Sequence, residues 1–379
     1  MQINNTIIDR IIGPISFTLL EPKNKKFPFI ILFGDEHIRP VDYSKNFTEI
    51  PKTYFVIDSD EFLQLLNSLA YEYDIDFNIE YFFNEDDIIA METNDISKIN
   101  LDIYKNKNFL QRLIEKTRIC HFKDLKNESN CIAPNLRWHY SDIRNNKKIE
   151  SLEYKIIEIL NSKNDVLNLD LIFQNENFKL FLHILNLFLH DLYNNDTKYI
   201  EYYLNHEEFN KSLVYKQIIK GNIFTLNQWK TYFIEYYKNM INDMNHIFKN
   251  QSQRFYIILK NYTDFYSSQN HEKLKELIVE NKNLLLYFNF YSMTATSLFL
   301  DFYYITRTFK NTQTKSDLSI CYFGSGHCDN IKYFLTNILS EYTIVYDSGI
   351  KMSSHPEYRI IKLPDLNLNS LLNSKDKNK

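Results

Sequence analysis

The fold is decided by the stretch FPFIILFGDEH, residues 27–37. Its first seven residues are apolar without alternation, which is typical of a strand buried on both faces of a largely parallel sheet. Gly34 ends the apolar run, and His37 follows three residues later. The chain has only six glycines among 379 residues, so each marks a place where a side chain is poorly tolerated. The stretch therefore predicts a buried strand and a sharp turn that carries His37.

A second stretch, LSICYFGSGH at residues 318–327, repeats this arrangement of apolar strand, Phe, Gly, two residues and His. In open α/β sheets, ligands bind at the carboxyl ends of the strands. We therefore predict that the two strands are parallel and close in one sheet, so that His37 and His327 meet beside Asp35 or Glu36. The alternative is that each glycine only ends a strand and each histidine caps the next helix.

The remaining pattern predicts an α/β fold with a central, mostly parallel sheet and a large helical insertion. Strand character at 7–20, helical spacing at 61–73 and a strand at 77–83 give a β-α-β order, and a helix is expected at 109–120. Later elements are a strand at 318–323, a helix at 329–339 and a strand at 342–346. The expected organisation is 1–149 as the first half of the α/β domain, 150–312 as the helical insertion, 313–365 as its completion and 366–379 as a disordered tail.

Composition narrows the partners and the compartment. Lys and Arg number 44 against 48 Asp and Glu, which gives no overall positive field for nucleic acid. The four cysteines are too few for a disulfide framework, and residues 1–10 lack a signal-peptide pattern, so we expect an intracellular protein with reduced thiols. The apolar helix at 284–309 contains Asn289, Asp301 and Arg307, which favours a buried helix over a membrane span. The expected partner is a small-molecule or peptide substrate, and self-association stays open.

Several polar residues stand in unusual surroundings. Glu80 lies in an apolar strand, where an unpaired buried carboxylate would cost free energy. It is therefore a ligand, a base or a paired structural charge, unless its position on the strand faces solvent. The segment 137–144 holds two guanidiniums, an imidazole and a carboxylate, which suits recognition of carboxylate or phosphate, although a salt-bridged loop is the alternative that such a segment ordinarily favours. The candidate substrate contacts there are Arg137, His139, Asp142 and Arg144.

A third polar group lies on the apolar helix before residue 310. Tyr303 and Arg307 share one face of it, with Asp301 at the edge of that face. Because buried polar groups need partners, these residues either brace the core or face the site, and we predict that they face the polar cluster. His183 and His190 share a helix face without an accompanying carboxylate, which favours core or interface histidines.

These motifs resemble those of a protein group of large nucleocytoplasmic DNA viruses, the giant viruses. The resemblance covers roughly residues 10 to 365 and rests on Gly34-Asp35-Glu36-His37, Glu80, Arg137-x-His139-Tyr140-x-Asp142-x-Arg144, Asp301-x-Tyr303-x-x-x-Arg307 and Tyr322-Phe323-Gly324-x-x-His327. More distantly, the two Gly-x-x-His motifs are similar to those of the superfamily of Tiki proteases, TraB/PrgY proteins, erythromycin esterases and ChaN-like haem-binding proteins. That likeness implies a sheet with a helical insertion and, in several branches, hydrolysis aided by His, Glu and sometimes a divalent cation.

Carried onto this chain, the resemblance implies catalytic roles for Asp35, His37, Glu80 and His327. Of these, His37, Glu80 and His327 would hold a divalent metal such as manganese, zinc or cobalt, and the arginine-bearing motifs would contact the substrate. Asp35 stands where the wider superfamily usually has Glu, and Gly326 stands where many members carry another residue. The resulting hypothesis is a hydrolase-like protein of the host-cell cytoplasm or the virion. Its rival is a catalytically inactive binding or structural protein that retains the fold.

Overall fold

The chain divides into two compact units. A computed structural model describes residues 1–36, 51–80, 109–118, 133, 135–141, 176–267, 272–273, 276, 298–310, 316–349 and 360–374. The first unit, here called the sheet unit, comprises Met1–Asp142, Gly221–Ile223 and Tyr303–Lys379. The second, the helical unit, comprises Ile143–Lys220 and Phe224–Phe302.

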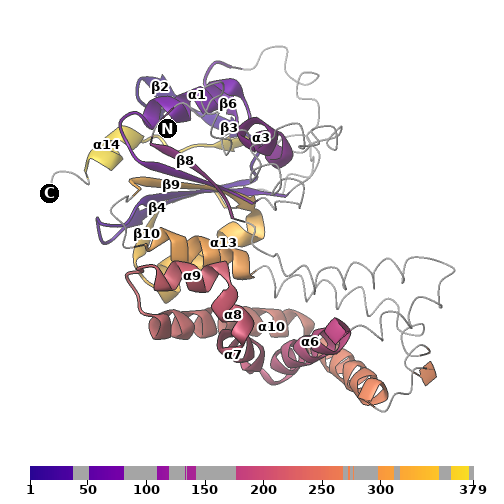
Figure 1. The fold of residues 1–379 in the computed structure, drawn as a ribbon. Coiled ribbons are helices and arrows are strands. Elements are labelled where there is room, and N and C mark those ends of the chain that lie inside the picture. The colour runs from indigo at the N-terminus through magenta and orange to yellow at the C-terminus, as the bar shows by residue number, and fades with distance from the viewer. Residues whose placement is uncertain are drawn as a thin grey trace, which may run out of the picture. The chain divides into compact units, whose positions relative to one another are not determined.

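The sheet unit is built on a six-stranded sheet with the order β10-β4-β5-β9-β7-β8 (Figure 1). Strands β5, β9, β7 and β8 are parallel to their neighbours, whereas β4 is antiparallel to β5 and β10 is antiparallel to β4. The predicted α/β class with a mostly parallel sheet is confirmed. The strands span Ser16–Pro22 (β4), Phe29–Asp35 (β5), Ile75–Ile79 (β7), Leu136–Tyr140 (β8), Leu318–Gly324 (β9) and Tyr342–Asp347 (β10).

Strand β9 comes late in the chain but lies between β5 and β7. Its register places Phe323 beside Gly34 and Gly324 beside Asp35 on one side, and Tyr322 beside Ile79 on the other. All of β5 and nearly all of β9 are buried, as their unalternating apolar sequences predict. The expectation that the two strands preceding the Gly-x-x-His turns are parallel neighbours is confirmed.

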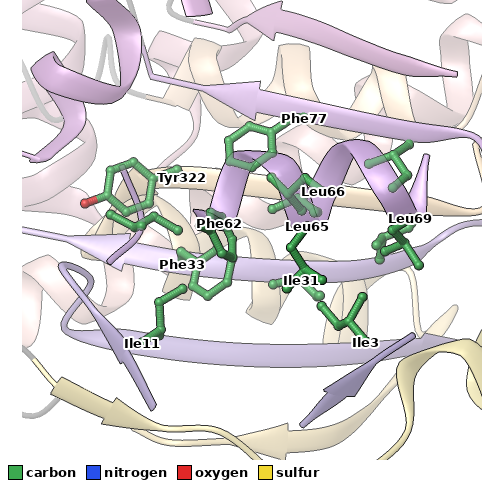
Figure 2. Close-up of a cluster of buried hydrophobic side chains, with 14 of the residues drawn as sticks. Ile3, Ile11, Ile31, Phe33, Phe62, Leu65, Leu66, Leu69, Phe77 and Tyr322 are labelled. Atoms are coloured by element: carbon green, nitrogen blue, oxygen red, sulfur yellow. The ribbon is translucent and has the colours of Figure 1, made fainter. Parts of the chain in front are cut away.

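One face of this sheet carries the main hydrophobic core. Helix α1 (Asp60–Leu69) begins at Ser59, whose hydroxyl accepts the N–H of Phe62, and presents four apolar residues at helical spacing. Figure 2 shows Phe62, Leu65, Leu66 and Leu69 packed over Ile31, Phe33, Phe77 and Tyr322 of the sheet. Burying a side chain of this size stabilises the fold by about 1.5–3 kcal/mol.

Smaller elements complete that side of the sheet unit. Helix α3 and a three-stranded sheet of β11, β3 and β6 lie with α1 on the same side (Figure 1). The short strands β1 and β2 pair with each other, and α14 contacts β1. These elements span Gln2–Ile3 (β1), Thr6–Ile7 (β2), Arg10–Ile12 (β3), Tyr54–Val56 (β6), Phe109–Arg118 (α3), Ile360–Lys362 (β11) and Leu368–Asn373 (α14).

The opposite face is covered by two helical segments. Helix α13 (Ser325–Tyr333) follows β9 directly and continues as the π-turn η6 (Phe334–Ile338). Residues 303–308 form the end of a second helix, whose Tyr304 hydroxyl lies 3.0 Å from the hydroxyl of Ser319 on β9. Beyond it, the ring of Phe309 meets the edge of Phe27 at 4.7 Å between centroids. This face therefore combines apolar packing with buried polar contacts.

The helical unit is formed by α6 (Glu176–Asn194), α7 (Lys198–Asn205), α8 (Glu207–Lys211), α9 (Leu213–Ile219) and α10 (Leu226–Ser267). Trp229, Phe233 and Tyr237 of α10 are buried, and Phe233 stacks on Phe302 at 3.8 Å between ring centroids. No helix in the described parts of the chain is long and apolar enough to cross a membrane.

Five expectations from the sequence need correction. The strand expected over 7–20 is divided among β2, β3 and β4, because the chain turns at Gly13 with a φ of +126°. The helix expected at 329–339 begins at Ser325, so His327 lies in its first turn. Residues 136–140 form strand β8 rather than a loop.

The expected disordered tail is wrong for residues 366–374. Leu368 and Leu372 are buried on one face of α14, and the side chain of Asn367 caps that helix by accepting the N–H of Ser370. The polar, lysine-rich composition of the segment led to the prediction of disorder, although the two leucines lie at helical spacing. At the other boundary, residues 303–310 belong to the sheet unit although the sequence placed them in the insertion.

Candidate functional site

The strand-end site lies at the carboxyl ends of β5, β9 and β7. Asp35 and Gly324 are register partners at the last positions of β5 and β9. Glu80 follows β7, and its backbone N–H donates to the carbonyl of Tyr322 at 3.2 Å. Because Glu80 continues the alternation of β7, its side chain is directed to the same face as Asp76 and Asn78.

The carboxylate of Glu80 joins β7 to the beginning of α13. Its Oε2 accepts the N–H of Gly324 at 2.6 Å, and its Oε1 lies 3.5 Å from Nε2 of His327. The side chains of Glu80 and His327 are 7% and 11% exposed. A nearly buried carboxylate with such partners avoids the cost of an isolated charge, which excludes the solvent-facing alternative for Glu80.

Gly34 permits α13 to begin directly above the end of β5. A Cβ at this position would come within 2.2 Å of the Ser16 hydroxyl and 3.0 Å of the Ser325 Cα. Asp35 beside it is almost completely buried, whereas a Cβ at Gly326 would meet no atom within 4 Å. Gly34 therefore serves close packing, whereas the position of Gly326 has space for a side chain.

The donors at this site fit a divalent metal only in part. Oε1 of Glu80 and Nε2 of His327 converge at a spacing compatible with two ligands that each lie about 2 Å from one ion. Within the described residues, the site does not bring together three metal-ligating atoms. His37, the third expected ligand, lies outside the described residues, as do Asp142 and Arg144.

An Arg–His–Asp cluster lies on the same face, earlier along β7 and β8. Arg137 donates from Nε to Oδ1 of Asp76 at 2.7 Å and from Nη1 to Oδ1 of Asp74 at 3.0 Å. Nε2 of His139 lies 2.8 Å from the same Asp76 oxygen, and Nη2 of Arg307 lies 2.7 Å from Nδ1 of His139. The structure thus unites Arg137, His139 and Arg307, three of the predicted substrate contacts, in one cluster.

The protonation states in this cluster follow from its hydrogen bonds. Burial by itself would raise the pKa of Asp76, but the bonds from His139 and Arg137 outweigh it and hold that pKa well below its usual range. Burial lowers the pKa of His139, and the positive charge of Arg307 lowers it further, against the opposing effect of Asp76. We therefore assign a neutral imidazole that donates from Nε2 to Asp76 and accepts at Nδ1 from Arg307.

Asn78 lies on β7 between Asp76 of the Arg–His–Asp cluster and Glu80 of the strand-end site. Its amide donates to the Ser319 hydroxyl at 3.3 Å, and its carbonyl oxygen lies 3.5 Å from the hydroxyl of Ser141. Asp76, Asn78 and Glu80 therefore form a polar stripe along one face of β7. Sequence reasoning recognised only Glu80, although the alternation DIDFNIE at 74–80 carries the signal for the whole stripe.

The other two candidates on the helix before residue 310 are Tyr303 and Asp301. Tyr303 is buried in the sheet unit. Asp301 belongs to the helical unit, where it is fully buried and accepts the hydroxyl of Tyr236 at 3.2 Å. Burial and then the charge of Asp301 raise the pKa of Tyr236 well above its ordinary value. Asp301 accordingly acts as a core partner of α10.

The helical unit holds a further histidine cluster. Nδ1 of His190 lies 3.6 Å from Oδ1 of Asp191 and 3.9 Å from Oδ2 of Asp196. Among the residues that the structure describes, these three form the group whose ligand atoms are close enough together to hold a metal ion. The sequence predicted no carboxylate beside His190, and this is wrong. The chain reverses after α6 and brings the carboxylate of Asp196 close to His190. His183, two turns earlier, is exposed and meets the edge of the Tyr202 ring.

Comparison with known proteins adds no relative: no family model, curated protein or solved structure matches the chain. The functional argument therefore rests on the contacts of its own residues.

Proposed function

We propose that the strand-end site is the reaction centre of a hydrolase-like enzyme, with His327 as the proton acceptor and Glu80 as its partner. The observation that carries this proposal is the 3.5 Å approach of Glu80 Oε1 to His327 Nε2 at the ends of two neighbouring parallel strands. Ligands of open α/β sheets bind at this position in the fold. A buried carboxylate beside an imidazole is also the arrangement used for general acid–base catalysis.

The chemistry assigned to the pair is activation of water. When Nε2 of His327 carries the ring hydrogen and faces Glu80, the other ring nitrogen accepts a proton from water as the oxygen attacks the substrate. The negative Glu80 stabilises the imidazolium that forms, and the same proton then passes to the leaving group. Asp35, at the end of the adjacent strand, is proposed to orient an imidazole at the site, and the Arg–His–Asp cluster to contact the substrate.

In the alternative form of this proposal, Glu80, His327 and His37 would hold a divalent ion such as manganese, zinc or cobalt, and Nε2 of His327 would be a ligand instead of carrying the ring hydrogen. When bound, such an ion would lower the pKa of its water toward about 7 and so supply hydroxide at neutral pH. Glu80 and His327 offer two converging donors for it. Element analysis of the wild type and of His327→Ala side by side tests this part, because the variant should contain one metal ion per chain fewer than the wild type.

The direct test of the proposed function is hydrolysis of a panel of small esters, amides and phosphoesters. His327→Ala and Glu80→Gln should each lower turnover by about 10²–10⁴-fold, the usual contribution of general acid–base catalysis. The double variant should be little worse than either single one, because parts of one site fail together. His183→Ala, an exposed histidine on α6, is the matched control and should keep full turnover. Additive losses, or full turnover in both single variants, would contradict a shared site.

A second candidate is favoured by the 2.6 Å bond between Glu80 and the Gly324 N–H. This hydrogen bond holds the end of β7 beside the beginning of α13 and has no catalytic role by itself. Such a contact is expected in a catalytically inactive binding or structural protein. Under this alternative, Glu80→Gln would lower the melting temperature while the wild-type protein shows no turnover and has the same metal content as His327→Ala. Turnover by the wild type that disappears in His327→Ala would reject it.

The proposal also includes the family and the location that the motifs indicate. The protein would belong to a giant virus and would lie in the host cytoplasm or in the virion. The adjacency of β5 and β9 is compatible with the superfamily of proteins with two Gly-x-x-His motifs. Mass spectrometry of purified virions and of infected-cell cytoplasm would test the location. If the protein were detected in neither fraction, the proposed location would be wrong.

A further inference from the structure

The junction of α6 and α7 in the helical unit gathers three metal-ligating side chains within a short stretch of chain. His190 and Asp191 lie about one turn before the end of α6 at Asn194, and Asn195 then adopts a left-handed conformation with a φ of +56°. That turn returns the chain so that Oδ2 of Asp196 lies 3.9 Å from Nδ1 of His190. With Asp191 Oδ1 at 3.6 Å from the same nitrogen, all three donors converge on one point.

The carboxylate of Asp191 is fixed in position by three hydrogen bonds. Its Oδ2 accepts the N–H of Tyr199 at 2.7 Å and the hydroxyl of Tyr237 at 3.0 Å, and its Oδ1 accepts the N–H of Lys198 at 3.0 Å. An ionised carboxylate offers about four lone-pair positions, so Oδ1, the oxygen nearest His190, keeps capacity for another partner. The Asp191 side chain is fully buried, so its carboxylate is removed from solvent. A cation on the Oδ1 side would offset that unfavourable desolvation.

Lys198 shows that the junction attracts a cation. Its ammonium lies 3.6 Å from Oδ2 of Asp196 and 3.2 Å from Nε2 of His190. The Lys198 side chain is 52% exposed, so it can move into solvent at little cost. A doubly charged ion among Asp191, Asp196 and His190 would therefore replace a weakly held single charge.

We propose that His190, Asp191 and Asp196 form a site for a divalent transition metal, with zinc as its best-matched occupant. One imidazole nitrogen and two carboxylate oxygens are a mixed donor set that favours zinc, cobalt or manganese over calcium, which prefers six or more oxygens. Three protein ligands leave further positions for water. The ion would pin the end of α6 to the beginning of α7. This site is independent of the strand-end site and of the function proposed for it.

Cobalt binding to the full-length protein, followed by visible absorption and by competition with zinc, tests the proposal. The measurement uses a Glu80→Gln, His327→Ala background, so that the strand-end donors do not contribute. One cobalt per chain is expected to bind. His190→Ala and Asp196→Asn should each weaken it by about tenfold or more, since even residues that only support a ligand change affinity 10–100-fold. Asp191 is left intact because its loss would also uncap α7.

Three controls decide the outcome. His183→Ala removes a histidine two turns earlier on α6 and should leave cobalt affinity unchanged. Lys198→Met removes the competing charge and should strengthen binding, and zinc should raise the melting temperature of the background protein but not that of its His190→Ala derivative. Absence of bound cobalt, or equal affinity in the background protein and both ligand variants, would overturn the proposal.

Discussion

The two faces of strand β7 show how one strand serves two purposes. Ile75, Phe77 and Ile79 are completely buried in the hydrophobic core beneath α1. Asp76, Asn78 and Glu80 alternate with them. Asn78 and Glu80 are buried and Asp76 is partly buried, and each is bonded to particular partners on β8, β9 or α13. The apolar face is stabilised by non-directional burial, which tolerates rearrangement. The polar face depends on individual bonds, so its substitutions should have specific consequences.

The largest effect should come from the apolar face. Phe77→Ala is expected to lower the free energy of unfolding by about 3–5 kcal/mol, because it leaves a cavity in a packed core. Urea unfolding followed by circular dichroism measures this. Tyr71→Ala is the matched control, since this aromatic residue is 62% exposed; a change within about 0.5 kcal/mol is expected there. Equal effects at both positions would contradict the assignment of the core.

On the polar face, Asp76→Ala should lower the free energy of unfolding by about 1–3 kcal/mol, because it deprives Arg137 and His139 of their shared acceptor. Asp74 also pairs with Arg137, but its side chain is 41% exposed against 21% for Asp76. Asp74→Ala should therefore change stability by only about 0–1 kcal/mol. Comparable losses for both carboxylates would mean that the cluster does not depend on His139.

His139 should give the polar face a pH dependence that the apolar face lacks. Its pKa is lowered in the folded state, so the unfolded chain binds more protons once the pH falls below about 6.5. The stability from the neutral imidazole is present above that pH and is lost as the pH decreases toward the folded pKa, by at most about 1.4 kcal/mol per pH unit. Unfolding between pH 7.5 and 5 measures the slope. The His139→Gln variant should show a smaller dependence of unfolding free energy on pH. A slope equal to that of the wild type would mean that other groups cause the pH dependence.

Only a small effect on stability is expected at His327. His327→Ala should lower the free energy of unfolding by about 1 kcal/mol, since Gly324 and the helical backbone fix the turn without the imidazole. The same variant should remove turnover or metal, if the strand-end proposal is correct. A loss as large as that of Phe77→Ala would show instead that the imidazole is part of the core. His37→Ala is expected to behave as His327→Ala does.

How far the sequence predicts this structure depends on whether local patterns determine it. The unalternating runs before Gly34 and Gly324 correctly predicted two buried parallel strands, and the spacing of Phe62, Leu65, Leu66 and Leu69 predicted α1. The bond between Arg307 and His139 joins residues 168 positions apart, and no local pattern specifies such a pair. Asp76 and Asn78 were missed because an alternating strand ordinarily faces solvent, whereas here a second layer covers it.

The position of β9 also bears on how the protein is made. Asn78 and Ser319 are hydrogen-bonded neighbours although 241 residues separate them. At the usual pace of translation, β5 and β7 would wait roughly tens of seconds for the strand that lies between them. During that interval each presents an unpaired apolar edge, which is a hazard for aggregation. We expect nascent chains that end before residue 318 to need chaperone protection and to be cleaved rapidly by protease, and chains that extend past residue 324 to become resistant.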